Sequence, residues 1–156
     1  MSPVIHKPVL IVIAGPNGSG KTTITSKILK HEWMEDAVYL NPDIIAQEKF
    51  GDWNSREAVL KSIFFVSTEH PSINASRIAR RVMKGGHDVP ISKIISRYYK
   101  SIVNCMKASK YADRTYIYDN TEENAEAKIL FRMTDGKLAK QYVAELPMWT
   151  APILKV

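Results

Sequence analysis

The chain has 156 residues, of which 45% are hydrophobic and 24% charged, a composition typical of one soluble globular domain and not of a disordered chain. Lysine and arginine total 22 against 16 aspartate and glutamate residues, and the net charge of +6 favours an anionic ligand, either a nucleotide or a nucleic acid. One cysteine, Cys105, excludes an internal disulfide.

The first apolar run begins at Val9, is too short for a signal peptide and leads into a glycine-rich loop. No apolar stretch reaches the roughly 18 residues needed to span a bilayer. The basic residues form no long block, which argues against a nucleic-acid-binding tail. We therefore expect a cytoplasmic protein without a membrane partner.

The stretch from Val9 to Thr23 carries the strongest signal. Val9–Ala14 is an unbroken apolar run, typical of a strand buried on both faces of a parallel sheet. The following residues, Gly15-Pro16-Asn17-Gly18-Ser19-Gly20-Lys21-Thr22, fit the pattern G-x-x-x-x-G-K-[ST], and a helix-compatible stretch continues to His31. A strand, a glycine loop and a helix in this order predict a phosphate-binding loop, and this context disfavours a chance match.

The chemistry of this loop explains its residue types. Glycines allow the backbone to approach a ligand, and the loop amides together with the helix N-terminus bind phosphate oxygens. Lys21 is expected to reach the β- and γ-phosphates, and the Thr22 hydroxyl to bind Mg²⁺. The predicted nucleotide-binding residues of this stretch are Gly15, Pro16, Asn17, Gly18, Ser19, Gly20, Lys21, Thr22 and Thr23.

A second short strand is predicted at Ala37–Leu40, and Asp43 follows its end. Open α/β sheets bind their ligands at such strand ends. From its position alone, Asp43 is equally a helix cap or a carboxylate that faces a bound γ-phosphate. Helices are predicted at Ile44–Phe50 and Arg56–Ser62.

The middle of the chain predicts a strand at Ile63–Val66 and two helices. The first helix runs from the His70-Pro71-Ser72 break to Met83, ends at Gly85-Gly86, and has a basic side made of Arg77, Arg80, Arg81 and Lys84. A basic helix beside a phosphate loop indicates a lid over phosphates more than a nucleic-acid surface. Asp88 or Ser92 is predicted to cap the second helix, whose core face is expected to hold Ile91, Ile94, Ile95, Tyr98, Ile102, Cys105 and Met106. Cys105 is thus expected to be a buried structural thiol.

The last third predicts a strand at Tyr116–Tyr118, which ends in Asp119-Asn120. Asp119 is either a magnesium carboxylate or part of a strand-end turn, and we favour the turn. Ile129–Thr134 and Lys137–Tyr142 predict a hairpin with an Asp-Gly turn, and the tail from Pro147 is predicted to be irregular. We predict one α/β domain over residues 1–156, a P-loop NTPase fold of three αβα layers around a parallel sheet.

Three stretches together resemble the zeta-toxin-like P-loop kinases. They are the glycine loop, the Asn-Pro-Asp-Ile-Ile-Ala stretch from Asn41, and the arginine-rich helix from Arg77 to Gly-Gly-His-Asp-Val-Pro with Arg97 downstream. The resemblance covers most of residues 8–120. It implies a nucleotide-kinase-like fold with a helical, arginine-bearing lid, and γ-phosphoryl transfer from ATP or GTP, with Mg²⁺, to a small-molecule hydroxyl. In the toxins this acceptor is the sugar of UDP-N-acetylglucosamine, and an antitoxin protein is the implied partner.

The resemblance also implies residue roles. Asp43 resembles the general base for the acceptor hydroxyl, and Lys21 and Thr22 the phosphate and Mg²⁺ groups. Arg81 (or Arg80) and Arg97 resemble lid arginines that clamp the transferring phosphoryl group, and Asn120 falls near the nucleotide base. Phosphoryl transfer depends on positioning and on neutralisation of phosphate charge, which these cations would supply. The implied catalytic set is Lys21, Asp43, Arg81 and Arg97.

One departure from the family pattern lies near residues 62/63. Such kinases carry several dozen more residues at this point, with a strand that ends in a Glu-x-Thr-like motif and binds the acceptor. Here Val59-Leu60-Lys61-Ser62 runs directly into Ile63. We expect either an internal deletion, which would expose strand edges, or a segment omitted from this sequence. The alternative function is therefore a nucleotide-binding ATPase or interaction module without kinase activity.

Overall fold

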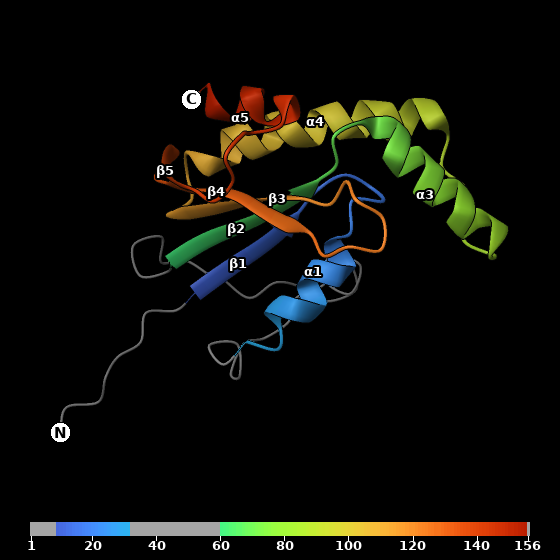
Figure 1. The fold of residues 1–156 in the computed structure, drawn as a ribbon, viewed down its shortest axis with the longest axis horizontal. Coiled ribbons are helices and arrows are strands. Elements are labelled where there is room, and N and C mark those ends of the chain that lie inside the picture. Colours follow the sequence, from blue (N-terminus) through green and yellow to red (C-terminus); the bar gives the residue numbers. More distant parts are fainter. Residues whose placement is uncertain (1–8, 32–59, 156) are drawn as a thin grey trace, which may run out of the picture.

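The computed structural model describes residues 9–31 and 60–155 of the chain (Figure 1). The elements in chain order are β1 (Val9–Ala14), α1 (Lys21–Ile28), β2 (Leu60–Ser67), α3 (Pro71–Met83), α4 (Ile91–Ser109), β3 (Arg114–Asp119), β4 (Lys128–Thr134), β5 (Lys137–Gln141), the 3₁₀ turn η2 (Met148–Thr150) and α5 (Ala151–Leu154). In Figure 1, α1 lies on one side of the sheet and α4 and α5 lie on the other. This arrangement confirms the α/β class and is compatible with three αβα layers.

The sheet has five described strands in the order β1-β2-β3-β4-β5. β1, β2 and β3 are parallel, whereas β4 and β5 are antiparallel to their neighbours. The prediction of a parallel sheet thus holds for the first three strands, and the sheet as a whole is mixed. The carboxyl ends of these three strands meet at one edge, where Ala14 pairs with Phe65 and Ser67 pairs with Asp119.

β2 buries side chains on both of its faces. Phe64 and Val66 pack with Ile24 and Ile28 of α1 in one cluster. On the opposite face, Phe65 belongs to a cluster that also includes residues of α4 and of the C-terminal segment. A strand covered on both faces needs no polar alternation, which explains the run Ile63–Val66. The prediction that β1 is also buried on both faces is wrong on one face. Ile11 and Ile13 pack against the α1 cluster, whereas Leu10 and Val12 on the other face are each 45% exposed at the edge of the described sheet.

The predicted helix Arg56–Ser62 is wrong at its end, because Leu60–Ser62 already belong to β2 and pair with Val9–Ile11 of β1. β2 therefore passes through Ser62 and Ile63 without a break. Pairing with strands on both sides overrides the weak helical pattern of this short stretch. The predicted elements at Ala37–Leu40 and Ile44–Phe50 lie outside the described residues.

α3 and α4 occupy the predicted positions, but the start of α4 differs. Pro90 is the N-cap residue, so neither Asp88 nor Ser92 caps this helix as predicted. The predicted core face is also narrower: Ile94, Tyr98, Ile102 and Cys105 are buried, whereas Ile91 is 65% and Ile95 is 42% exposed. Residues spaced by three or four along α4 meet the sheet. Ile95 lies to one side of this line, whereas Ile91 lies on the line but is the first residue of the helix.

The tail from Pro147 is not irregular as predicted, because it forms η2 and α5. Trp149 and Ile153 are buried against Phe65 and α4, so tertiary packing supplies the order that local sequence does not show. The hairpin between β4 and β5 forms as predicted, with positive φ at Asp135 and Gly136. No described helix is long and apolar enough to cross a membrane.

Candidate phosphate-binding site

The glycine loop connects the end of β1 to α1 at the carboxyl edge of the parallel strands. Gly20 is the N-cap residue of α1, with a left-handed φ of 95°, and no side chain caps the first amides of the helix. The first turn of α1 carries no acidic residue. The helix N-terminus therefore presents amides and the positive end of its dipole, which together favour an anion.

Lys21 folds back across this loop. Its Nζ donates to the carbonyl oxygens of Gly15 at 2.9 Å and Pro16 at 3.0 Å. Burial lowers the pKa of Lys21, and the positive charge of Arg81 lowers this pKa further. The ammonium group is thus held at the loop by weak neutral acceptors, which a phosphate oxygen would replace with a stronger charged one.

Three other side chains donate to the loop carbonyls. Asn74 Nδ2 binds Asn17 O at 2.7 Å, Arg77 Nη1 binds Gly18 O at 3.3 Å, and Asn120 Nδ2 binds Ser19 O at 2.9 Å. Arg77 was predicted only as part of the basic side of this helix, and Asn74 was not predicted as a site residue. Their acceptors lie more than 50 residues away along the chain, so local sequence gives little signal for these contacts.

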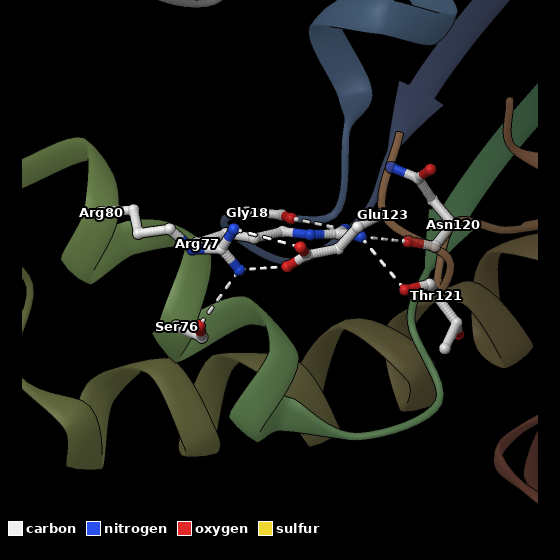
Figure 2. Close-up of polar contacts among 7 residues, drawn as sticks. All are labelled: Gly18, Ser76, Arg77, Arg80, Asn120, Thr121 and Glu123. Carbon is white, nitrogen blue, oxygen red and sulfur yellow. Dashed lines mark hydrogen bonds and ion pairs between the residues drawn. The ribbon is translucent and has the colours of Figure 1, made fainter. Parts of the chain in front are cut away.

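Arg77 links the loop to the segment that follows β3. Figure 2 shows its guanidinium between Gly18 and the carbonyls of Asn120 and Thr121, which accept hydrogen bonds from Nη2 at 2.7 and 3.3 Å. A planar guanidinium has several donors in a fixed geometry, so one side chain can bind all three carbonyls. Arg77 is half-buried, in contrast to the other arginines of α3.

Arg80 and Arg81 differ in their surroundings. Arg80 forms an ion pair with Glu123 and also donates to Ser76 Oγ at 3.3 Å (Figure 2). The hydrogen bond and charge of this pair raise the pKa of Arg80 and lower that of Glu123. Arg81 is exposed, and its charge acts on Lys21. Of the two predicted lid candidates, Arg81 is therefore the one coupled electrostatically to the loop.

The remaining predicted site residues are placed as follows. Thr22 and Thr23 are exposed in the first turn of α1, and Asn120 lies against the loop. Arg97 is exposed on α4, and in residues 9–31 and 60–155 it makes no hydrogen bond or ion pair with the loop. Asp43 lies outside the described residues.

Both carboxylate oxygens of Asp119 accept hydrogen bonds. Oδ1 accepts from the Thr121 amide at 2.9 Å, and Oδ2 accepts from Trp149 Nε1 at 2.8 Å. This geometry supports the strand-end turn favoured for Asp119 over the magnesium carboxylate. Among the described residues, no group of three or more histidine, cysteine, aspartate or glutamate side chains is placed to hold a metal ion.

A small cavity of about 70 Å³ opens beside the loop, between α1 and the segment after β3. Its lining includes the aliphatic side chain of Ile24, the ring of Tyr118 and the amide of Asn120. Its walls are mostly apolar with a few polar groups, as is common in small-molecule sites.

Comparison with known proteins relates the N-terminal stretch to a protein family. The family model described as Zeta toxin matches residues 2–58, a range that includes β1, the glycine loop and Asp43. No curated protein and no solved structure shows a significant match to the chain. The resemblance to this family is therefore confirmed for the N-terminal stretch.

Proposed function

We propose that this protein binds a nucleoside triphosphate with Mg²⁺ and transfers the γ-phosphate to the hydroxyl group of a small molecule. The glycine loop between β1 and α1, with Lys21 folded across it, carries this proposal. The Zeta toxin match over residues 2–58 supports a kinase over the other activities that use such loops.

The loop residues fit a triphosphate and its metal ion. The α1 N-terminus lacks both a side-chain cap and acidic residues, and the buried Ser19 hydroxyl has no hydrogen-bond partner in the described part of the chain. The exposed Thr22 hydroxyl is the proposed Mg²⁺ ligand. Bound Mg²⁺ would neutralise phosphate charge, while Lys21 and the loop amides would hold the phosphate oxygens in place.

We assign the lid role to Arg81 and not to Arg80, because Arg80 is paired with Glu123 while the charge of Arg81 acts on Lys21. Arg97 is the proposed second lid arginine and would have to approach the phosphates from α4. The cavity beside Tyr118 is the proposed place of the nucleotide base.

Asp43 is the proposed general base, which accepts the proton of the acceptor hydroxyl as the phosphoryl group is transferred. The resemblance to the zeta toxins is the basis for three proposals: Asp43 as general base, a UDP-sugar as acceptor, and an antitoxin protein as partner. We also propose that the protein acts in the cytoplasm.

The proposal is tested by ³¹P NMR of the protein with ATP or GTP, Mg²⁺ and a panel of UDP-sugars. We expect an acceptor-dependent phosphorylated product, and a loss of rate of at least about 100-fold in Lys21→Ala and in Asp43→Asn. Lys30→Ala, at an exposed lysine just after α1, is the matched control and should retain the rate. Nucleotide binding without transfer to any acceptor would contradict the kinase proposal.

A second candidate function follows from the continuous strand β2, which leaves no room in the described chain for the acceptor-binding insertion of the family near residues 62/63. In this case the protein binds nucleotide and hydrolyses it slowly without an acceptor. An acceptor-dependent burst of ADP would exclude this function. An intact mass of 17.7 kDa would favour the deletion, and a larger mass would indicate an omitted segment.

A further inference from the structure

We infer that Asn74, Arg77 and Asn120 are positioning residues, which hold three successive carbonyls of the glycine loop and so direct its amides at a phosphate. The inference rests on the proposed function and deepens it. It also gives Asn120 a different role from a contact with the nucleotide base.

The three donors come from two separate parts of the fold. Asn74 and Arg77 lie one turn apart on α3 and hold the carbonyls of Asn17 and Gly18. Asn120 follows β3 and holds the next carbonyl, that of Ser19. Each of these consecutive peptide groups is thus fixed by a side chain from outside the loop.

The planar peptide bond turns these contacts into an orientation of the amides. In a trans peptide, the carbonyl of one residue and the amide of the next point in opposite directions. Asn74, which binds Asn17 O, therefore directs the Gly18 amide away from itself, and Asn120, which binds Ser19 O, does the same for the Gly20 amide. The Ser19 amide is used within the loop, where it donates to Pro16 O at 3.2 Å. Glycine-rich backbone is flexible by itself, so an external restraint is needed to fix this arrangement before a ligand binds.

The donors are themselves fixed by the sheet edge. Asn74 is fully buried, and its Oδ1 accepts from Thr68 Oγ1 just beyond β2, so its amide nitrogen faces the loop. The backbone amide of Asn120 donates to Ser67 O, the last residue of β2, at 2.8 Å. Arg77, one turn after Asn74 on α3, also binds Asn120 O through Nη2. The network thus connects the loop to the carboxyl ends of β2 and β3.

Two glycines of the loop leave the space that Asn74 and Asn120 occupy. A Cβ atom on Gly20 would overlap Asn120 Nδ2, and a Cβ atom on Gly18 would lie 3.0 Å from the Asn74 carbonyl oxygen. Both glycines therefore let the asparagines approach the loop backbone, in addition to the positive φ that they adopt.

The test compares Asn120→Ala and Arg77→Lys with the matched controls Asn104→Ala and Arg114→Lys, which replace exposed residues of the same types. Calorimetry measures the binding of ATP and of magnesium tripolyphosphate, which has phosphates but no base. Nitrogen-15 relaxation of the unliganded protein measures the order of the Gly18 and Gly20 amides. We expect about tenfold weaker binding of both ligands by the two variants, lower order of these amides, and no change in the controls.

The binding and relaxation results distinguish a failure of the positioning role from a failure of the proposed function. Weaker ATP binding with unchanged tripolyphosphate binding would make Asn120 a base contact and overturn the inference. Absence of any ligand binding by the parent protein would overturn the proposed function, and the relaxation data would still decide the inference, because unchanged loop order in both variants contradicts it. Arg77→Lys retains a charge and a donor, so a partial effect there with a full effect in Asn120→Ala supports positioning through hydrogen-bond geometry.

Discussion

The amide group of Asn120 occupies the space that a side chain at Gly20 would need, and the same amide donates to Ser19 O at 2.9 Å. Asn120 and Ser19 are 101 residues apart in the chain, so this contact joins the first strand–loop–helix unit to the end of β3. Gly20 therefore meets a packing requirement of the protein around the loop.

The contact between Asn120 and Gly20 predicts that Gly20→Ala destabilises the protein more than alanine at another glycine with a similar φ. Gly20 and Gly85 have nearly equal φ values, 95° and 90°, but a Cβ at Gly85 would meet no atom within 4 Å. Both substitutions incur backbone strain, and Gly20→Ala also displaces Asn120. We expect Gly20→Ala to lower the free energy of unfolding by about 1–3 kcal/mol more than Gly85→Ala, as measured by urea denaturation. The double variant Gly20→Ala/Asn120→Ala should recover part of the difference, and equal losses in the two single variants would contradict the packing described here.

The pKa of Lys21 should respond to Arg81. Arg81→Gln removes a positive charge that lowers this pKa, so the pKa should move up toward the ordinary value of 10.5. An NMR titration of the Lys21 side chain measures this shift. Arg80→Gln is the matched control, because Arg80 is paired with Glu123. An equal response to both substitutions would remove the basis for assigning the lid role to Arg81.

The same lowered pKa has a consequence for stability. Between the lowered pKa of folded Lys21 and 10.5, the unfolded state binds more protons than the folded state, so the contribution of Lys21 to the free energy of unfolding rises with pH in this window. Arg81→Gln should raise the pKa of folded Lys21 and so narrow the pH range over which this contribution changes. Denaturation at a series of pH values, with Lys21→Met as the reference that lacks the titrating group, isolates this contribution.

The buried Tyr98 hydroxyl leads us to expect that the protein loses stability at alkaline pH. Its buried hydroxyl donates to Thr68 O at 2.6 Å, and burial raises its pKa from 10.0 to about 12. The raised pKa means that its stabilising contribution is complete below pH 10 and is lost as the pH rises toward about 12. Tyr98→Phe should lower the free energy of unfolding at neutral pH by about 1–3 kcal/mol, because Thr68 O is left without its donor. Tyr111→Phe, at a residue 81% exposed, should change little, and a similar loss in both variants would contradict this account.

Asp119 should stabilise the C-terminal segment and leave metal binding unchanged. Asp119→Asn weakens the hydrogen bonds to Trp149 Nε1 and the Thr121 amide, and we expect a loss of about 1–2 kcal/mol in the free energy of unfolding. Trp149 fluorescence reports the unfolding, and calorimetry with ATP at varied Mg²⁺ tests the metal. Asp135→Asn in the exposed hairpin turn is the control. A changed Mg²⁺ requirement in Asp119→Asn alone would restore the magnesium-carboxylate hypothesis.

Local patterns were sufficient to predict much of this fold. The glycine loop, the α3 helix and the Asp135-Gly136 hairpin depend on neighbours in the sequence, and they form where expected. The burial of Cys105 was also predicted, and burial raises the pKa of its thiol to about 12. Helical spacing alone reveals such a core position.

Other features depend on contacts between distant segments, which a single sequence does not show. Leu60–Ser62 become a strand because β1 lies beside them, and Trp149 becomes part of a helical turn because it packs against Phe65. Arg77 and Arg81 lie one turn apart on the same predicted basic side of the helix, and only the fold separates a loop-binding arginine from an exposed one. The predicted roles of Asp43 and Arg97 stay predictions.

The acidic segment after β3 responds to ionic strength differently from the glycine loop beside it. Glu122, Glu123 and Glu126 pair with Lys128, Arg80 and Lys27, and all three pairs are exposed. Mobile counterions screen such pairs, with a Debye length of about 8 Å at physiological salt and about 3 Å at 1 M. The bonds from Asn74, Arg77 and Asn120 to the loop have neutral carbonyl acceptors and are partly buried, so salt weakens them little. Concentrated salt should therefore release Arg80 from Glu123 while the loop keeps its shape.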